Sequence, residues 1–443
     1  MAELARTLTV WRGTAILLNI VLGAGLLTLP GLAIGAVGAS APLIWLACAL
    51  VSVPLLIVFA RLGSRFPGSG GIASFAAEAF GLRGRSVATF LLLGAVILGL
   101  PSIALIGGHY AATLIAVDSH LAAGLLLLAA ALPNLLSPGR AGRVQGMLAT
   151  VLLLFFCVVI LACGLALGDG ANPGSATGLP QLPTVRIFVS VFLMVFFAFT
   201  GWELGAGISA EFHNPVRDFP LAICMSFLAV VALYLGLTLL LLAIDLTPEQ
   251  AAAPLVPLTY RVFGGTGEAA VSIAAVVLVL ANLSAAIWAV SRLLWSSAGD
   301  GLLPRRLASL HHGAPLWAVA VTLIALSSAL ALSGAAEITL ATFLEFAGQN
   351  FFLLYAVAAL VLFRRRAKPS DAPLALVAVV IVLGLLALRP PVLLLYPALC
   401  VALGLLAARH AGRRREASLP HPVQPTEGKV CADASTLTAR SAA

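Results

Sequence analysis

Apolar runs of about 20 residues recur along the whole chain, and each is long enough to cross about 30 Å of hydrocarbon as a helix. Hydrophobic residues make up 61% of the 443 residues and charged residues only 9%, whereas a soluble globular protein carries roughly 25% charge. One water-soluble core cannot bury so much apolar surface. A membrane barrel would show alternating segments of about 10 residues instead. The chain is therefore predicted to be an all-α polytopic membrane protein.

We predict twelve transmembrane helices joined by loops. They cover residues 12–36, 41–61, 87–116, 120–137, 145–168, 186–210, 218–244, 268–297, 315–333, 339–363, 373–389 and 391–409. Segment 62–86 is too polar and too rich in glycine to cross a membrane, and we expect it to form a loop with a short interfacial helix. The first run is too long for the apolar part of a cleavable signal peptide.

The basic residues predict the orientation of these helices. With the N-terminus in the cytoplasm, all but Arg186, Arg261 and Arg389 of the 25 Lys and Arg residues fall in inner segments. This split satisfies the positive-inside rule with both termini cytoplasmic. Basic loops that meet anionic inner-leaflet lipid explain the net charge of +8, so no nucleic-acid partner is expected. Residues 1–11 form the predicted cytoplasmic N-terminus, and residues 410–443 a disordered cytoplasmic tail.

The sequence gives no sign of a cofactor, a metal site or an enzyme. Five of the six cysteines lie in apolar runs and the sixth, Cys431, lies in the tail, without a spacing typical of metal ligands or disulfides. The only short glycine motif in the first apolar run lacks the Lys-Ser/Thr of a phosphate-binding loop. No zinc-protease motif or nucleophile elbow is present either.

The first predicted span contains residues that disfavour a helix interior. In the stretch LNIVLGAGLLTLPG, Leu18 to Gly31, Gly23 and Gly25 fall near the middle of the span, and Pro30 follows. Small residues that let two helices pack closely are the simpler explanation. The alternative is a helix that is interrupted in the membrane.

A similar stretch in the sixth predicted span favours the interruption. The segment VFFAFTGWELGAGISAEF has Thr200-Gly201 near mid-depth, and Glu203 follows inside an apolar run. The two stretches hold equivalent places in two sets of five predicted spans, 12–168 and 186–363, and an odd number of spans turns the second set upside down. Interrupted spans at corresponding positions of two halves indicate a transporter site at the membrane midplane.

The chemistry of an interrupted helix suggests the ligand. The break exposes free N–H groups at the start of one half and free C=O groups at the end of the other. In lipid these groups must face protein, water or ligand. The positive end of a helix dipole suits a carboxylate and the carbonyls suit an ammonium. Two adjacent breaks therefore predict a site for a zwitterion, and an α-amino acid is the common small molecule of this kind. Aromatic residues near the second break, Phe196, Phe197, Phe199 and Trp202, predict an apolar side-chain pocket.

Three stretches resemble the amino acid–polyamine–organocation (APC) superfamily. GAGLLTLPG resembles the family's first-helix pattern GxGIFxxPG, FFAFTGWE…AEFHNPVRDFPLAI its sixth helix and following loop, and SRLLWSSAGDGLLPRRLA the end of its eighth helix. The similarity covers nearly the whole chain, and within the superfamily it is greatest with bacterial exporters of methionine and branched-chain amino acids. Leu26-Leu27 replaces the usual Ile-Phe, and the fifth span lacks the Lys that some members carry in place of sodium.

The resemblance implies a five-plus-five inverted repeat, with two extra helices at 373–409, and no cofactor. It also implies a set of substrate-binding residues. The carboxylate would lie on the amides of Gly23, Ala24 and Gly25. The ammonium would lie on carbonyls around Ile20 and Val21 and around Phe196 to Phe199, next to Gly201.

Ionisable and strongly polar residues inside the predicted spans are candidates for function. For Glu203 we predict a proton-coupling or gating role, the alternative being a structural acid bonded to its neighbours. Glu345 in the tenth span fits a vestibule or a packing role equally. His109 is more typical of a structural histidine. Asn19 and Asn282 are typical of interhelical hydrogen bonds.

These observations predict a secondary transporter of neutral, apolar amino acids in a bacterial inner membrane. Export by proton antiport is the preferred direction, and import by proton symport is the nearest alternative. A receptor or sensor on the same scaffold is a third hypothesis, and a channel is disfavoured because no ring of charges repeats along the chain. The expected partners are the amino acid, protons and membrane lipid, with the chain as a monomer or homodimer.

Overall fold

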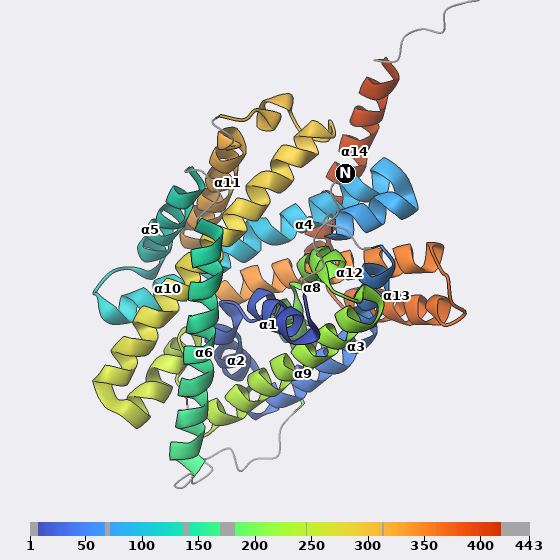
Figure 1. The fold of residues 1–443 in the computed structure, drawn as a ribbon. Coiled ribbons are helices and arrows are strands. Elements are labelled where there is room, and N and C mark those ends of the chain that lie inside the picture. The colour runs from blue at the N-terminus through green and yellow to red at the C-terminus, as the bar shows by residue number, and fades with distance from the viewer. Residues whose placement is uncertain are drawn as a thin grey trace, which may run out of the picture.

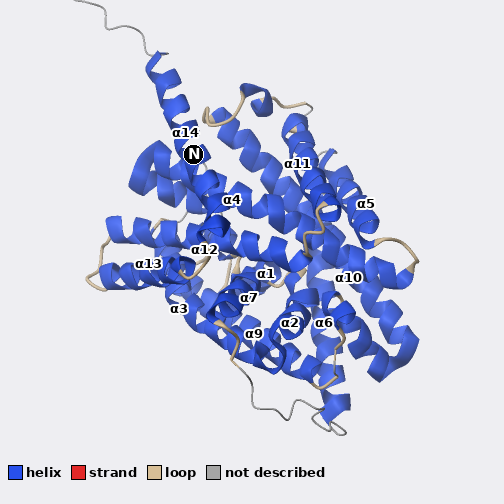
Figure 2. Ribbon diagram, turned by 180° about the vertical axis from the view of Figure 1, so that it is seen from behind, coloured by secondary structure: helices blue, strands red, loops and turns tan. Residues whose placement is uncertain are grey.

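The computed structural model describes residues 8–66, 71–135, 141–168, 182–244, 246–311 and 314–417. Helices make up nearly all of this part, and its only extended pairings are isolated bridges such as that of Leu8 with Phe212 (Figure 2). The α-helices are α1 (Val10–Val21), α2 (Gly25–Val37), α3 (Ala41–Arg65), α4 (Gly71–Leu114), α5 (Ser119–Ala131), α6 (Ala141–Gly168), α7 (Val185–Phe196), α8 (Trp202–Gly205), α9 (Pro215–Leu242), α10 (Leu255–Gly299), α11 (Leu316–Ala335), α12 (Leu340–Arg364), α13 (Asp371–Ala387) and α14 (Leu395–Ala417). Short 3₁₀ helices join them, namely η1 (Gly38–Ser40), η2 (Leu132–Leu135), η3 (Phe197–Phe199), η4 (Ala206–Glu211), η5 (Pro248–Ala252), η6 (Arg305–Ala308) and η7 (Pro391–Leu394).

The prediction of a polytopic helical membrane protein is confirmed. Within the described ranges, eight helical stretches are long and apolar enough to cross a membrane, and four shorter apolar helices accompany them. Many large apolar side chains on these helices are exposed, such as Leu50, Leu154 and Ile324. Lipid is the medium that accommodates such an apolar exterior without cost.

The order of helices repeats between the two halves of the chain. An interrupted helix comes first in each half (α1 with α2, then α7 with η3, α8 and η4), and one long helix follows (α3, then α9). The next helix in each half is bent at a glycine with positive φ, Gly81 in α4 (φ 60°) and Gly264 in α10 (φ 64°). A pair of helices completes each half, α5 with α6 and then α11 with α12.

Helix contacts repeat in the same way. In the first half α4 packs on α5, and in the second α10 packs on α11. Between the halves, α4 packs on α12 and α10 on α6, while α1 packs on α9 and α7 on α3. Each contact has its counterpart when the halves are exchanged. The first interrupted helix, formed by α1 and α2, lies near the middle of the molecule. The end of α14 projects from the helical body (Figure 1).

The structure gives the bounds of three segments that the sequence singles out. The predicted interfacial helix within 62–86 is present as residues 71–80, since the bend at Gly81 separates it from the rest of α4. The predicted span 186–210 contains the interruption expected at Thr200 and Gly201. The predicted tail beginning at 410 was wrong for its first residues, because α14 continues to Ala417; residues 418–443 lie outside the described part, as do residues 1–7.

A charged cluster ties α3 to the start of α13. The Asp371 carboxylate has no exposed side-chain surface and accepts hydrogen bonds from Arg61 (2.6 Å) and Arg65 (2.6 and 3.1 Å). The backbone amides of Ala367 and Lys368 also donate to it, each at 2.9 Å. Burial opposes ionisation of this carboxyl, which lies before the predicted span 373–389. The hydrogen bonds outweigh that effect and hold its pKa below the usual range.

Candidate functional site: the junction of two interrupted helices

The first interruption spans Leu22 to Ala24. Leu22 has φ −81° and ψ 76°, and the amide of Gly23 donates to the carbonyl of Val21 at 3.0 Å, which together form an inverse γ-turn. The helix restarts with 3₁₀-type bonds from Leu26 to Gly23 and from Leu27 to Ala24. Among the described residues, no backbone acceptor pairs with the amides of Ala24 and Gly25. Of the three amides predicted to face the carboxylate, those of Ala24 and Gly25 have no backbone acceptor, whereas that of Gly23 donates to Val21.

The second interruption lies between η3 and α8. Thr200 is extended, and Gly201 has φ 112°, a left-handed conformation that suits glycine. The amide and the hydroxyl of Thr200 both donate to the carbonyl of Phe197, at 3.3 and 2.7 Å. The helix resumes with a bond from the amide of Gly205 to the carbonyl of Gly201. The predicted break at Thr200-Gly201 therefore lies at the expected residues.

The two interruptions lie against each other. A Cβ atom on Gly201 would lie 3.3 Å from the carbonyl oxygen of Ile20 and within 3.3 Å of the side chains of Ile20 and Val21. The end of α1 thus meets the break before α8, and α2 begins four residues beyond Val21. This junction brings carbonyls from one half-helix close to free amides of another, which is the arrangement that a zwitterion requires.

Glu203 lies inside this junction and has specific partners. Its carboxylate is 2% exposed, accepts hydrogen bonds from the amide of Gly201 (3.0 Å to each oxygen) and accepts one from the hydroxyl of Tyr355 (2.8 Å). Tyr355 belongs to α12 and also lies 3.3 Å from the carbonyl oxygen of Phe199. The carboxylate of Glu203 therefore connects the second interruption to α12. The hydrogen bonds fit a structural acid, and the burial fits a proton-coupling or gating carboxylate, so this geometry is compatible with both hypotheses for Glu203.

The predicted aromatic residues divide into two groups. Phe196 is fully buried and packs on α12, with ring centroids 4.7 Å from Phe352 and 5.5 Å from Tyr355. Its ring thus fills the interface between α7 and α12. Phe197 is only partly buried and contacts Phe351, with ring centroids 6.1 Å apart. Of the four aromatic candidates, Phe197 is therefore the one with accessible surface.

Phe199 and Trp202 belong to a second aromatic group, which they form with side chains of α3 and α9. Phe199 lies 6.0 Å from Trp45 and 6.5 Å from Tyr234, measured between ring centroids. Trp202 is fully buried and lies 6.5 Å from Phe227, and its indole Nε1 has no hydrogen-bond partner in the described part of the chain. The sequence does not single out Trp45, Tyr234 and Tyr355, because single aromatic residues in apolar spans carry no local signal of function.

The remaining polar candidates occupy different places. The Nδ2 atom of Asn282 lies 3.0 Å from the position of a Cβ on Gly23, so α10 brings this amide to the first break. Asn19 makes the predicted interhelical hydrogen bond, to Thr150 of α6 at 3.0 Å. Glu345 is ion-paired with Arg389, away from the junction. His109 follows Gly108, which packs against Ser119 at the start of α5, and no described hydrogen bond joins His109 to either break.

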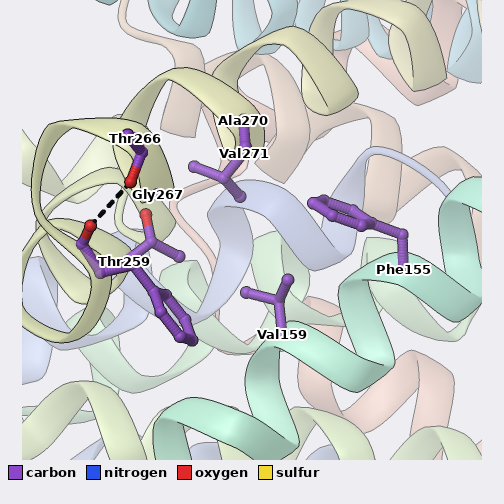
Figure 3. Close-up of a pocket in the computed structure, with 8 residues that line it drawn as sticks. Phe155, Val159, Thr259, Thr266, Gly267, Ala270 and Val271 are labelled. Carbon is purple, nitrogen blue, oxygen red and sulfur yellow. Dashed lines mark hydrogen bonds between the residues drawn. The ribbon is translucent and has the colours of Figure 1, made fainter.

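A separate cavity of about 280 Å³ lies between α6 and the bend of α10 (Figure 3). Its wall is almost entirely apolar, and Phe155, Val159 and Val271 point into it. The hydroxyl of Thr266 is bonded to the carbonyl of Phe263 at 2.9 Å. No lining residue belongs to an interrupted helix, so this cavity is distinct from the junction.

The fold and the junction define a membrane transporter class built on paired interrupted helices. Comparison with known proteins supports this assignment. The family model described as amino acid permease matches residues 8–402. The chain belongs to this family, which lies within the APC superfamily; it is a transporter of amino acids and not an enzyme.

Three relatives illustrate the range of the family. The chain is 28% identical to the uncharacterized amino acid permease YecA of Bacillus subtilis, over 83% of this chain and 87% of that protein. It is 31% identical to the L-methionine/branched-chain amino acid exporter YjeH of Escherichia coli, over 67% and 71%. It is also 26% identical to the human cystine/glutamate transporter, over 84% and 76%.

Proposed function

We propose that the protein is a secondary active transporter that exports neutral, apolar amino acids of the methionine, leucine, isoleucine and valine class. Transport would occur by proton antiport across a bacterial inner membrane, with both termini in the cytoplasm. The observation that carries the proposal is the contact of Gly201 with the carbonyl of Ile20, which joins the two interruptions into one site.

The charges of the junction support a neutral substrate. Free amides at the start of α2 suit the carboxylate, and the carbonyl of Ile20 suits the ammonium. Glu203 is the acidic side chain in the described part of the junction, and its carboxylate already accepts hydrogen bonds from the amide of Gly201 and the hydroxyl of Tyr355. A charged substrate side chain would therefore lack a counter-ion there, whereas Phe197 offers apolar surface.

The exporter YjeH supports the direction and the substrate class of the proposal. Its name gives L-methionine and branched-chain amino acids as its substrates, and it is 31% identical to this chain. An apolar pocket at Phe197 is compatible with side chains of that class. The cystine/glutamate transporter is a more distant relative at 26% identity, and its name indicates substrates with polar groups.

Alternating access would use the twofold pattern of contacts described above. Five helices in each half, in the same order and with equivalent contacts, support an inverted repeat of five plus five spans, with α13 and α14 as two further spans. The bundle would comprise α1, α2, α3, α7 to η4, and α9. It would rock against the other helices around the junction.

Glu203 offers a route for proton coupling. Its carboxylate links the amide of Gly201, in the bundle, to the hydroxyl of Tyr355 on α12, outside the bundle. A proton on this carboxylate would remove its negative charge and weaken both charge-assisted hydrogen bonds. The contact between bundle and scaffold would then depend on the protonation state, as antiport requires.

Purified protein in liposomes tests the proposal. Labelled leucine and methionine are followed with and without an imposed pH gradient, and labelled lysine is the control. Gradient-driven movement of leucine and methionine opposite to the proton flow is expected. Movement with the protons would indicate an importer, saturable binding without flux would indicate a sensor, and neither flux nor binding would refute the substrate class.

A further inference from the structure

A buried hydroxyl without a partner lies beside the start of α2. Tyr234 of α9 is fully buried, and its hydroxyl has no hydrogen-bond partner among the described residues. The hydroxyl oxygen lies 3.0 Å from the position of a Cβ atom on Gly25. Gly25 and Ala24 carry the two amides that lack a backbone acceptor. Three donors without acceptors are therefore gathered at one helix terminus.

Packing fixes the position of this hydroxyl. The ring of Tyr234 stacks on Trp45 of α3, with centroids 4.5 Å apart and an interplanar angle of 16°. Phe199 of η3 borders the same ring at 6.5 Å. A phenol held between three other elements cannot turn to find an alternative partner without repacking the aromatic group.

The surroundings favour an anionic acceptor as the missing partner. Buried polar groups in proteins are almost always hydrogen-bonded, so an unpaired buried donor indicates a partner that is bound only part of the time. Gly25, beside this hydroxyl, is the first residue of a 13-residue helix, and the positive end of a helix favours negative charge.

We propose that Tyr234 donates a hydrogen bond to the carboxylate of the bound amino acid, beside the amides of Ala24 and Gly25. Tyr234 is then a binding residue that selects substrates bearing a carboxylate, and it is supplied by α9 rather than by either interrupted helix. This inference rests on the proposed function, because it assigns a further contact to the same site.

The experiment compares two ligands and three proteins. Equilibrium binding of L-leucine and of L-leucinol, in which an alcohol replaces the carboxylate, is measured for wild-type protein, Tyr234→Phe and Tyr110→Phe. Phenylalanine keeps the stack on Trp45 and removes only the hydroxyl. Tyr110 is the matched control, because it is also a fully buried tyrosine that contacts α2, where its hydroxyl donates to the carbonyl of Leu27 at 2.6 Å.

We expect Tyr234→Phe to weaken leucine binding about tenfold, which corresponds to about 1.4 kcal/mol, and to leave leucinol binding unchanged. Tyr110→Phe should not change the ratio of the two affinities. Unchanged leucine binding by Tyr234→Phe, or an equal loss for both ligands, would overturn the inference while leaving the proposed function intact. Absence of leucine binding by the wild-type protein would instead refute the proposed function and this inference with it.

The thermal midpoint of each variant in detergent separates a folding defect from a binding defect. If Tyr234→Phe does not fold, leucine and leucinol are compared on Trp45→Phe, which removes the stacking indole and should displace the hydroxyl. A selective loss of leucine binding supports the inference in that case, and an equal loss of both ligands contradicts it.

Discussion

Gly201 and Ile20, from two helices that are far apart in the sequence, meet so closely that the carbonyl oxygen of Ile20 lies 3.3 Å from the place of a Cβ on Gly201. Gly201 also has φ 112°, which L side chains rarely adopt. The contact brings both interruptions into one site, and it explains why a residue without a side chain occupies this position.

Replacing Gly201 with alanine should abolish transport. The new methyl group would press on Ile20 and Val21, and strain at this φ costs about 1–3 kcal/mol. Leucine flux in liposomes should fall at least tenfold. Gly236→Ala in α9 is the matched control, since a Cβ there meets nothing within 4 Å; normal flux in Gly201→Ala would contradict the junction as the site.

Glu203→Gln should uncouple transport from the pH gradient. The amide keeps the size of the side chain and can still bond to Tyr355, but it cannot take up a proton. Exchange of labelled for unlabelled leucine should continue, while gradient-driven accumulation is lost. An unchanged dependence on the gradient would assign Glu203 to the structural role, in which it only holds the amide of Gly201.

Changing the size of Phe197 should change the order of substrate preference. Its ring is partly exposed and borders Phe351 and Gly99, so Phe197→Leu would enlarge the space for a substrate side chain. Competition of leucine, methionine and phenylalanine against labelled leucine measures the order. Phe192→Leu, in the buried edge-to-face contact of α7 with Phe352 of α12, should lower the thermal midpoint and leave the order unchanged.

Asp371→Asn should destabilise the protein by about 2 kcal/mol, because it leaves Arg61 and Arg65 without their counter-charge while both are partly solvated. The pKa of the Asp371 carboxyl in the folded protein lies below its ordinary value of 3.8. The contribution of this carboxylate to the free energy of unfolding is therefore fully present above pH 3.8 and is lost only as the pH falls below that value.

The difference in thermal midpoint between wild type and Asp371→Asn should thus be constant from about pH 5 to 8 and shrink below about pH 4. Glu78→Gln is the control, since Glu78 is 60% exposed and its ion pair with Arg365 should contribute less than about 1 kcal/mol. A midpoint difference that changes between pH 5 and 8 would contradict this assignment.

Local sequence signals predicted the membrane class and the position of both interruptions. Glycines in the centre of apolar runs are such a signal, and Gly25 and Gly201 mark the breaks that the structure contains. The end of α14 was misplaced because a run of basic residues reduces hydropathy without ending a helix. The bend at Gly264 was not predicted, because glycines before an apolar run, here Gly264, Gly265 and Gly267, have the same local pattern whether or not the helix bends.

Long-range contacts could not be predicted from the sequence. The side-chain partners of Glu203 and Asp371 lie far along the chain, and neither Tyr355 nor Arg65 has a local sequence pattern that marks it as a partner. The inverse γ-turn at Leu22, in which the amide of Gly23 donates to the carbonyl of Val21, was not predicted either. Phe196 packs against Phe352 of α12, and no local pattern around Phe196 predicts that contact.

The most direct measurement is a structure of the protein with L-leucine bound. We expect ligand density at the junction, with the carboxylate within hydrogen-bonding distance of the amides of Ala24 and Gly25 and the ammonium near the carbonyl of Ile20. Leucine density in the cavity between α6 and α10 instead, with an empty junction, would contradict it.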